Sequence, residues 1–153
     1  MLSTPHVIVG AAIGVKFVNP QIAVPVAFAS HFILDMAPHW NPKILSEVRK
    51  QGTVSQLSQK FIVFDTVLAL IAGITIAGLQ PIQQSQKLVI IACCFFSVLP
   101  DLLSVPYLFL HQTKGIFGWW MSFKKSIQND VGLFWGNATQ TLTIVAAIYW
   151  IVS

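Results

Sequence analysis

Long apolar runs separated by short polar connections dominate this chain of 153 residues. Runs of this length and composition are typical of membrane helices, which need about 20 apolar residues to cross a bilayer. The pattern therefore predicts an all-α fold, a polytopic membrane helix bundle of about four to five apolar helices in one domain, residues 1–153. The expected helices are about 5–18, 21–37, 61–79, 88–110 and 131–152.

The first two expected helices form a short hairpin. Thr4 and Pro5 suit the start of a helix, and Asn19-Pro20 suits the turn that follows it. The first run is shorter than the roughly 20 residues of a full span, so this hairpin is tilted or does not quite cross. Small residues from Gly10 to Gly14 favour close packing of the first helix against another one.

Two longer polar segments interrupt the apolar runs. Residues 41–60 are expected to form an exposed polar loop, and residues 111–130, with Trp119 and Trp120 beside lysines, an interfacial segment. With the N-terminus inside, these two segments face the cytoplasm and carry seven of the 9 Lys and Arg residues, whereas the opposite side has only Lys16 and Lys87. This asymmetry favours the arrangement with the N-terminus inside.

The composition agrees with an integral membrane protein. Hydrophobic residues make up 55% of the chain and charged residues 9%, with a mean hydropathy of +0.71, whereas soluble domains carry about a quarter charged residues. No basic stretch with interleaved aromatic residues stands out as a nucleic-acid surface, so no nucleic-acid partner is expected. Membrane lipid is the expected partner of the apolar surface.

A histidine and aspartate stripe lies at the end of the second apolar run. His31, Asp35 and His39 are spaced i, i+4 and i+8, so a helix would align them on one face. Imidazole and carboxylate groups together suit a divalent ion such as zinc. Pro38 is expected to bend or end the helix near Ala37, so that His39 approaches from a loop.

Acidic residues within apolar segments are costly unless they are paired or bind a cation, so each is a functional candidate. The predicted topology brings such residues to one level near the cytoplasmic side. We predict that they form one metal site, with Asp65 and Asp101 also as catalytic candidates and one or two ions, zinc or alternatively manganese. The predicted ligands are His6, His31, Asp35, His39, Asp65 and Asp101.

Structural roles for the same residues stay open. Asp65 could cap a helix or pair with Lys60, Asp101 could cap a helix that restarts after Pro100, and His6 could be an interfacial histidine. His111, beside a basic segment, is interpreted as structural. The whole set could instead form a polar network that only fixes helix packing.

Two short motifs resemble a known family. Thr4-Pro5-His6 followed by Gly10, together with the later segment Leu99 to Leu102, resembles the membrane-bound metal-dependent hydrolase family of bacteria and archaea. Members are small multi-span proteins of the inner membrane. The resemblance implies a prokaryotic inner-membrane protein with hydrolase activity.

A second resemblance concerns the segment from His31 to His39. It is similar to the His-Phe-x-x-Asp helix of zinc-dependent phospholipase C and the related P1-type nucleases, in which the His and Asp are zinc ligands. This implies zinc binding by His31 and Asp35. The chain lacks the second His-x-x-x-Asp/Glu pair of those enzymes, so one or two ions are expected instead of three.

The sequence thus predicts a metal-dependent hydrolase of a lipid-like ester or phosphoester, acting at the cytoplasmic edge of the membrane. A proton- or cation-coupled transporter is the first alternative, because the same buried groups could relay cations. A non-catalytic membrane scaffold that uses these residues for packing is the second.

Overall fold

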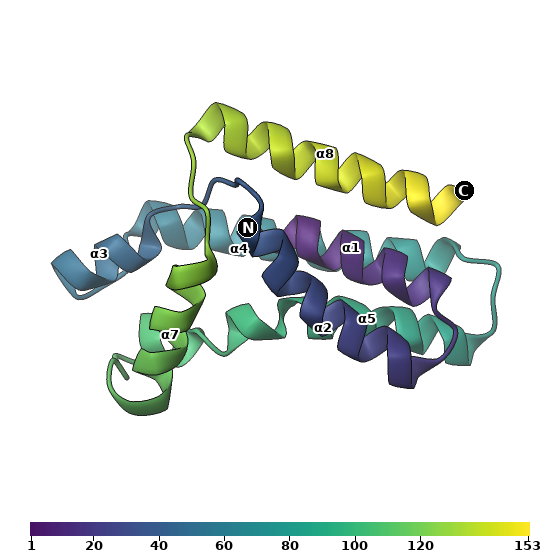
Figure 1. Ribbon diagram of the computed structural model, residues 1–153, viewed down its shortest axis with the longest axis horizontal. Coiled ribbons are helices and arrows are strands. Elements are labelled where there is room, and N and C mark those ends of the chain that lie inside the picture. Colours follow the sequence, from purple (N-terminus) through teal and green to yellow (C-terminus); the bar gives the residue numbers. More distant parts are fainter.

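The computed structural model describes residues 1–153 and confirms the all-α fold, with eight helices and no strand (Figure 1). One isolated bridge, between His39 and Asp130, is the only extended pairing. The helices are α1 (Ser3–Lys16), α2 (Pro20–Met36), α3 (Ile44–Gln51), α4 (Gln56–Leu79), α5 (Gln84–Leu102), α6 (Val105–Phe109), α7 (Gly115–Ile127) and α8 (Leu133–Val152).

Helix α1 is the centre of the bundle and contacts α2, α4, α5 and α8. Its small residues allow this, because Ala11 and Ala12 are fully buried. A Cβ added to Gly10 would lie 2.7 Å from the Cys93 carbonyl oxygen, and one added to Gly14 would lie 2.7 Å from the Cα of Ile90. The predicted close packing along this side of α1 is therefore confirmed, and its partner is α5.

The predicted turns at both ends of α2 are confirmed. The side chain of Asn19 accepts a hydrogen bond of 2.9 Å from the Gln21 N–H, which caps the start of α2. The helix ends at Met36, before Pro38. The chain that follows is extended at Ala37 and carries His39 out of the helical stripe.

Two predicted boundaries are wrong. The helix expected over 88–110 begins earlier, at Gln84, and ends earlier, at Leu102. It ends there because Pro106 has no N–H to bond the Leu102 carbonyl, and the proline ring would clash with that carbonyl in a continuous helix. The polar loop 41–60 contains α3 and the first turn of α4, which starts at Gln56 because Ser55 caps it. Helix α7 occupies most of the segment 111–130, and the expected interfacial position of this segment stays a prediction.

Two helices, α4 and α5, are long and apolar enough to cross a membrane. Helices α1 and α2 have 14 and 17 residues and are shorter than a span. The predicted bundle of four to five apolar membrane helices is therefore not confirmed beyond α4 and α5.

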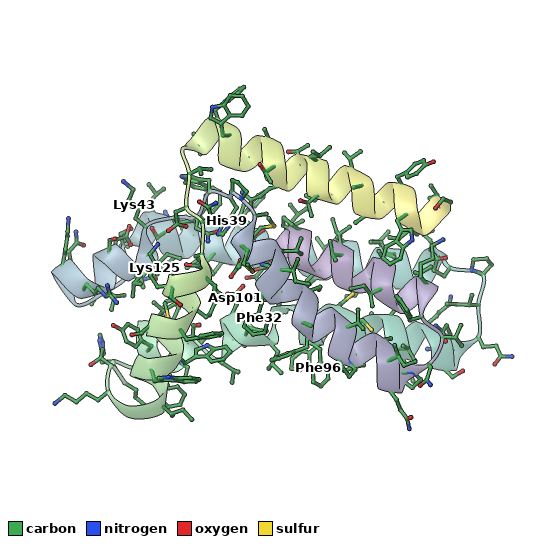
Figure 2. The ribbon with its side chains drawn as sticks, in the orientation of Figure 1. Phe32, His39, Lys43, Phe96, Asp101 and Lys125 are labelled. Carbon is green, nitrogen blue, oxygen red and sulfur yellow. The ribbon has the colours of Figure 1, made fainter.

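The N-terminus lies at the end of the bundle where α3 and α7 project, and the C-terminus lies at the opposite end (Figure 1). Helices α1, α4 and α8 start at the first end, whereas α2 and α5 finish there. Figure 2 shows His39 and Asp101 at the junction between this end of the bundle and α7. The chain direction of each helix thus decides which polar residues can meet.

Candidate metal centre

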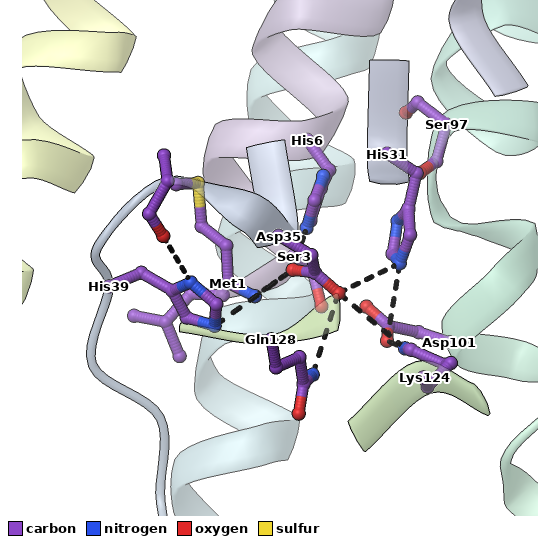
Figure 3. A network of polar contacts seen from close by, with 12 residues as sticks. Met1, Ser3, His6, His31, Asp35, His39, Ser97, Asp101, Lys124 and Gln128 are labelled. Atoms are coloured by element: carbon purple, nitrogen blue, oxygen red, sulfur yellow. Dashed lines mark hydrogen bonds and ion pairs between the residues drawn. The ribbon is translucent and has the colours of Figure 1, made fainter. Parts of the chain in front are cut away.

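Five of the six predicted ligands lie together at this end of the bundle (Figure 3). They come from three helices and one loop, and all except Asp101 are fully buried. These residues are His6 of α1, His31 and Asp35 of α2, His39 after α2, and Asp101 of α5.

Asp35 is the centre of the cluster. Its Oδ1 lies 3.3 Å from His6 Nε2, and its Oδ2 lies 3.4 Å from His31 Nε2. The Nε2 atom of His39 is 3.9 Å from Asp35 Oδ1. The i, i+4 spacing explains the approach of His31, whereas His39 reaches the same carboxylate from the loop that Pro38 starts.

The Nε2 atoms of the three histidines have no hydrogen-bond partner although the rings are fully buried. A buried polar atom without a partner costs about 1–3 kcal/mol, so such atoms are rare in native proteins. The rings of His6 and His31 also stack, with centroids 4.1 Å apart. The three Nε2 atoms therefore lack hydrogen bonds around one carboxylate, that of Asp35, whose Oδ1 is also paired with the buried N-terminal ammonium group of Met1.

Backbone carbonyls fix the tautomers of two of these rings. The Nδ1 atom of His31 is 2.8 Å from the Ser97 carbonyl oxygen, and Nδ1 of His39 is 2.8 Å from the Ala37 carbonyl oxygen. Because a carbonyl only accepts, each Nδ1 carries a proton. In the neutral form of either ring, the lone pair would then lie on Nε2. Metal-binding histidines are usually oriented by such a bond.

The contacts between Asp35 and its two nearest histidines are long for hydrogen bonds. The contacts of 3.3 and 3.4 Å from Asp35 to His6 and His31 exceed the usual hydrogen-bond length. They match the separation of about 3.3–3.4 Å between two ligand atoms around a tetrahedral ion with bonds of about 2.0–2.1 Å. One ligand atom each from His6, His31 and Asp101 also lies within 4.8 Å of the others. The identity of an ion that this group could hold, zinc or manganese, stays a prediction.

Helix α7 contributes a lysine that the sequence analysis did not assign to the site. Lys124 is only 3% exposed, and its ammonium group forms an ion pair with Asp101 and lies 4.0 Å from Asp35 Oδ2. Directly after the end of α7, Gln128 donates a hydrogen bond of 3.4 Å to the same Asp35 oxygen. The i, i+4 spacing of these residues was visible in the sequence, but nothing there placed α7 against the site.

Extended backbone joins the two loops that border the cluster. The His39 N–H donates to the Asn129 carbonyl at 3.0 Å, and the Val131 N–H donates to the His39 carbonyl at 2.9 Å. The carboxylate of Asp130 thereby comes within 3.8 Å of His39 Nε2 and also pairs with Lys125. Burial lowers the pKa of His39 below its usual 6.5, which keeps its ring neutral at pH 7.

Asp65 has partners other than the predicted ones. Its carboxylate accepts hydrogen bonds of 2.6 Å from the Ser3 N–H, 3.2 Å from the Thr4 N–H and 2.7 Å from the Thr4 hydroxyl. No side chain of α1 itself caps that helix, so Asp65 caps it from α4. These contacts place Asp65 at the α1–α4 junction and agree with the helix-capping alternative, while its roles as metal ligand and catalytic residue stay predictions.

Comparisons with known proteins do not identify the chain: no family model, curated protein or solved structure matches it. The resemblance to membrane-bound metal-dependent hydrolases therefore stays a prediction. The functional argument depends on the residues of the cluster.

Proposed function

We propose that this protein is a membrane-bound, metal-dependent hydrolase of a lipid-like ester or phosphoester. One observation carries the proposal: three buried imidazoles turn unpartnered Nε2 atoms towards a single buried carboxylate, Asp35. A network that only fixed helix packing would satisfy these nitrogens with hydrogen bonds.

The apolar surface supports a membrane location. In α4 and α5, only 22% and 28% of the apolar stretch is buried inside the protein, whereas a core helix of a soluble protein is mostly buried. The exposed side chains of α4 include Leu70, Ile71 and Ile74. Apolar surface this extensive needs lipid or another protein to cover it.

The distribution of positive charge supports a site near the cytoplasmic face. Lys16 ends α1 and Lys87 lies in the first turn of α5, so both lie at the end of the bundle away from the cluster. The other seven basic residues belong to α3, the start of α4, α7 and the segments that flank them, at the same end as the cluster. Because basic residues favour the cytoplasmic side, the cluster would lie at the cytoplasmic edge of the bilayer.

The chain supplies distinct groups for hydrolysis. His6, His31 and Asp35 would hold a divalent ion, with Asp101 as a further ligand or as the general base. Such an ion makes water acidic enough to attack at neutral pH and polarises the ester oxygen. The side chain of Asp101 is 34% exposed, so it is the acidic group of this set that solvent and substrate reach. The ammonium group of Lys124 would stabilise negative charge that develops on the substrate.

Elemental analysis of the protein purified in detergent tests the proposal. We expect bound zinc or manganese in the wild type and its loss in His31→Ala and Asp35→Ala. His111→Ala is the matched control, since His111 is an exposed histidine outside the cluster. Mixed lipid vesicles incubated with the loaded protein should release a headgroup or a fatty acid, detected by mass spectrometry. A wild-type protein that binds no metal but carries cations across liposomes would refute the hydrolase and support the transporter.

A further inference from the structure

We infer that the end of the bundle formed by α3 and α7 binds the anionic headgroups of a phospholipid bilayer. This inference rests on the membrane location in the proposed function, but on neither the metal nor the reaction. Two features carry it: a group of exposed cations without internal partners, and an exposed aromatic face on α7. The two helices form one unit, because Val48 of α3 belongs to a small apolar core on which Phe117 and Met121 of α7 pack.

The exposed cations at this end have no acidic partner inside the protein. None of them forms an ion pair, whereas the two lysines near the end of α7 both do. The unpaired cations are Lys43, Arg49, Lys50, Lys60 and Lys114. They belong to α3, the start of α4 and the residue before α7, so they gather at one end of the bundle. A cluster of this size beside a membrane helix is typical of proteins that bind anionic lipid.

The acidic side chains of the chain, 5 in number, all have other partners. The carboxylates of Asp35, Asp101 and Asp130 pair with the N-terminal ammonium group and with two lysines of α7. Those of Asp65 and Glu47 accept hydrogen bonds at the starts of α1 and α4. The protein therefore has no further carboxylate to offer the exposed cations, and an external anionic surface is their complementary partner.

Helix α7 also has an apolar face that stays exposed. Phe117 and Met121 face the apolar core shared with α3, whereas Ile116, Trp119 and Phe123, spaced i, i+3 and i+7, lie on the outer side of the helix. Ile116 is 72% exposed and Trp119 is 64% exposed. Tryptophan is enriched at the level of the lipid headgroups, and an apolar helix face flanked by lysines is typical of a helix that lies in this interface.

The orientation of α7 agrees with such a position. The helix crosses the end of the bundle, whereas α4 and α5 run along its length (Figure 1). With α4 and α5 across a bilayer, α7 would therefore lie along the bilayer surface. The ring of Phe123 also lies 6.0 Å from that of Phe32 of α2, and Phe32 lies 5.4 Å from Phe28. The outer face of α7 is thus continuous with the apolar side of α2.

An anionic bilayer fits both features. A soluble polyanion such as RNA would pair with the cations but would leave the side chains of Ile116 and Trp119 in water. A neutral bilayer would cover the apolar face but would offer no net charge to the cations. Each cation close to an anionic lipid surface strengthens binding about fivefold, so the exposed cations favour anionic over zwitterionic lipid.

Quenching of tryptophan fluorescence by brominated lipids tests the inference. The protein is placed in phosphatidylcholine liposomes with a small share of either brominated phosphatidylglycerol or brominated phosphatidylcholine, and the difference between the wild type and Trp119→Phe isolates the emission of Trp119. Both lipids should quench this emission, and the anionic one should do so at a lower share. Combined Arg49→Gln and Lys50→Gln should reduce this preference, by up to about fivefold for each cation removed. Combined Lys16→Gln and Lys87→Gln is the matched control, because it removes the same charge at the opposite end and should keep the preference.

The outcomes separate this inference from the proposed function. Equal quenching by the two lipids in the wild type, or a preference that Arg49→Gln and Lys50→Gln leave unchanged, overturns the anionic-lipid surface and leaves the hydrolase. Emission of Trp119 that neither lipid quenches, while other tryptophans are quenched, overturns the placement of α7. If no tryptophan is quenched, the membrane location of the proposed function fails as well. A change in Trp119 emission on addition of RNA or polyglutamate in detergent, with no quenching by either lipid, would assign a soluble partner and overturn the inference.

Discussion

Substitution of Gly10 by alanine tests how closely α1 must approach α5. The new Cβ would lie 2.7 Å from both the Cys93 carbonyl oxygen and the Ser97 Oγ, and 2.9 Å from the Ser97 Cβ. Ordinary contact begins at 3.4 Å, so α5 would have to move by about 0.7 Å, the difference between 3.4 and 2.7 Å. That movement would also take the Ser97 carbonyl away from His31 Nδ1.

Two opposing contributions decide how Gly10→Ala changes the free energy of unfolding. Overpacking of a close interface costs about 1–3 kcal/mol, whereas alanine gains up to about 1 kcal/mol over glycine from helix propensity. Gly78→Ala is the matched control, because Gly78 also lies in a helix and a Cβ there meets no atom within 4 Å. Since both variants share the propensity term, the difference between their unfolding free energies should be about 1–3 kcal/mol.

Urea unfolding in mild detergent, followed by far-ultraviolet circular dichroism, measures this difference. Gly10→Ala should unfold at a lower urea concentration than Gly78→Ala and should also bind metal more weakly, because His31 loses its orienting carbonyl. Equal unfolding free energies in the two variants would refute the close packing of α1 on α5.

Three further predictions concern other parts of the fold. Asp65→Asn should lower the unfolding free energy by about 1–2 kcal/mol, because it weakens the cap of α1. It should leave the metal content unchanged, and loss of metal would instead show that Asp65 is a ligand. Hydrogen bonds from Ser55 hold the pKa of Glu47 below its usual 4.5. The ionised carboxylate of Glu47 therefore stabilises the fold at neutral pH, and this stabilisation is lost as the pH falls through the lowered pKa. Glu47→Gln should therefore reduce the melting temperature at pH 7 more than at pH 3, and an equal reduction at both would contradict this. Gly136→Ala should displace the His39 loop, because its Cβ would lie 2.8 Å from the His39 carbonyl carbon, and should weaken metal binding without loss of helicity. Unchanged metal affinity would contradict this.

The sequence was sufficient to predict which end of the bundle holds most of the site. His6 begins one apolar run, whereas His31 and Asp101 lie near the ends of two others. Because successive helices alternate in direction, these positions meet at one end, and the structure places them there. The spacing of His31 and Asp35 likewise predicted their contact, since the helix period depends on local geometry alone.

The residues of this region that the sequence analysis did not place correctly are positioned by tertiary contacts. Asp65 lies at the predicted level, but its partners are backbone N–H groups of α1, which carry no signal in the amino-acid sequence. Lys124 and Asp130 belong to a segment whose position is decided by the pairing of His39 with Asn129 and Val131. No hydropathy or spacing pattern identifies such a pairing.

The bridge between His39 and the segment before α8 also constrains the order of assembly during synthesis. The ribosome releases α1 and α2 first, yet the backbone groups of His39 find their partners only when residues 129–131 emerge. Until then the imidazoles of the hairpin remain incompletely enclosed. A chain that ends before residue 129 would therefore leave the backbone N–H and carbonyl of His39 without these partners.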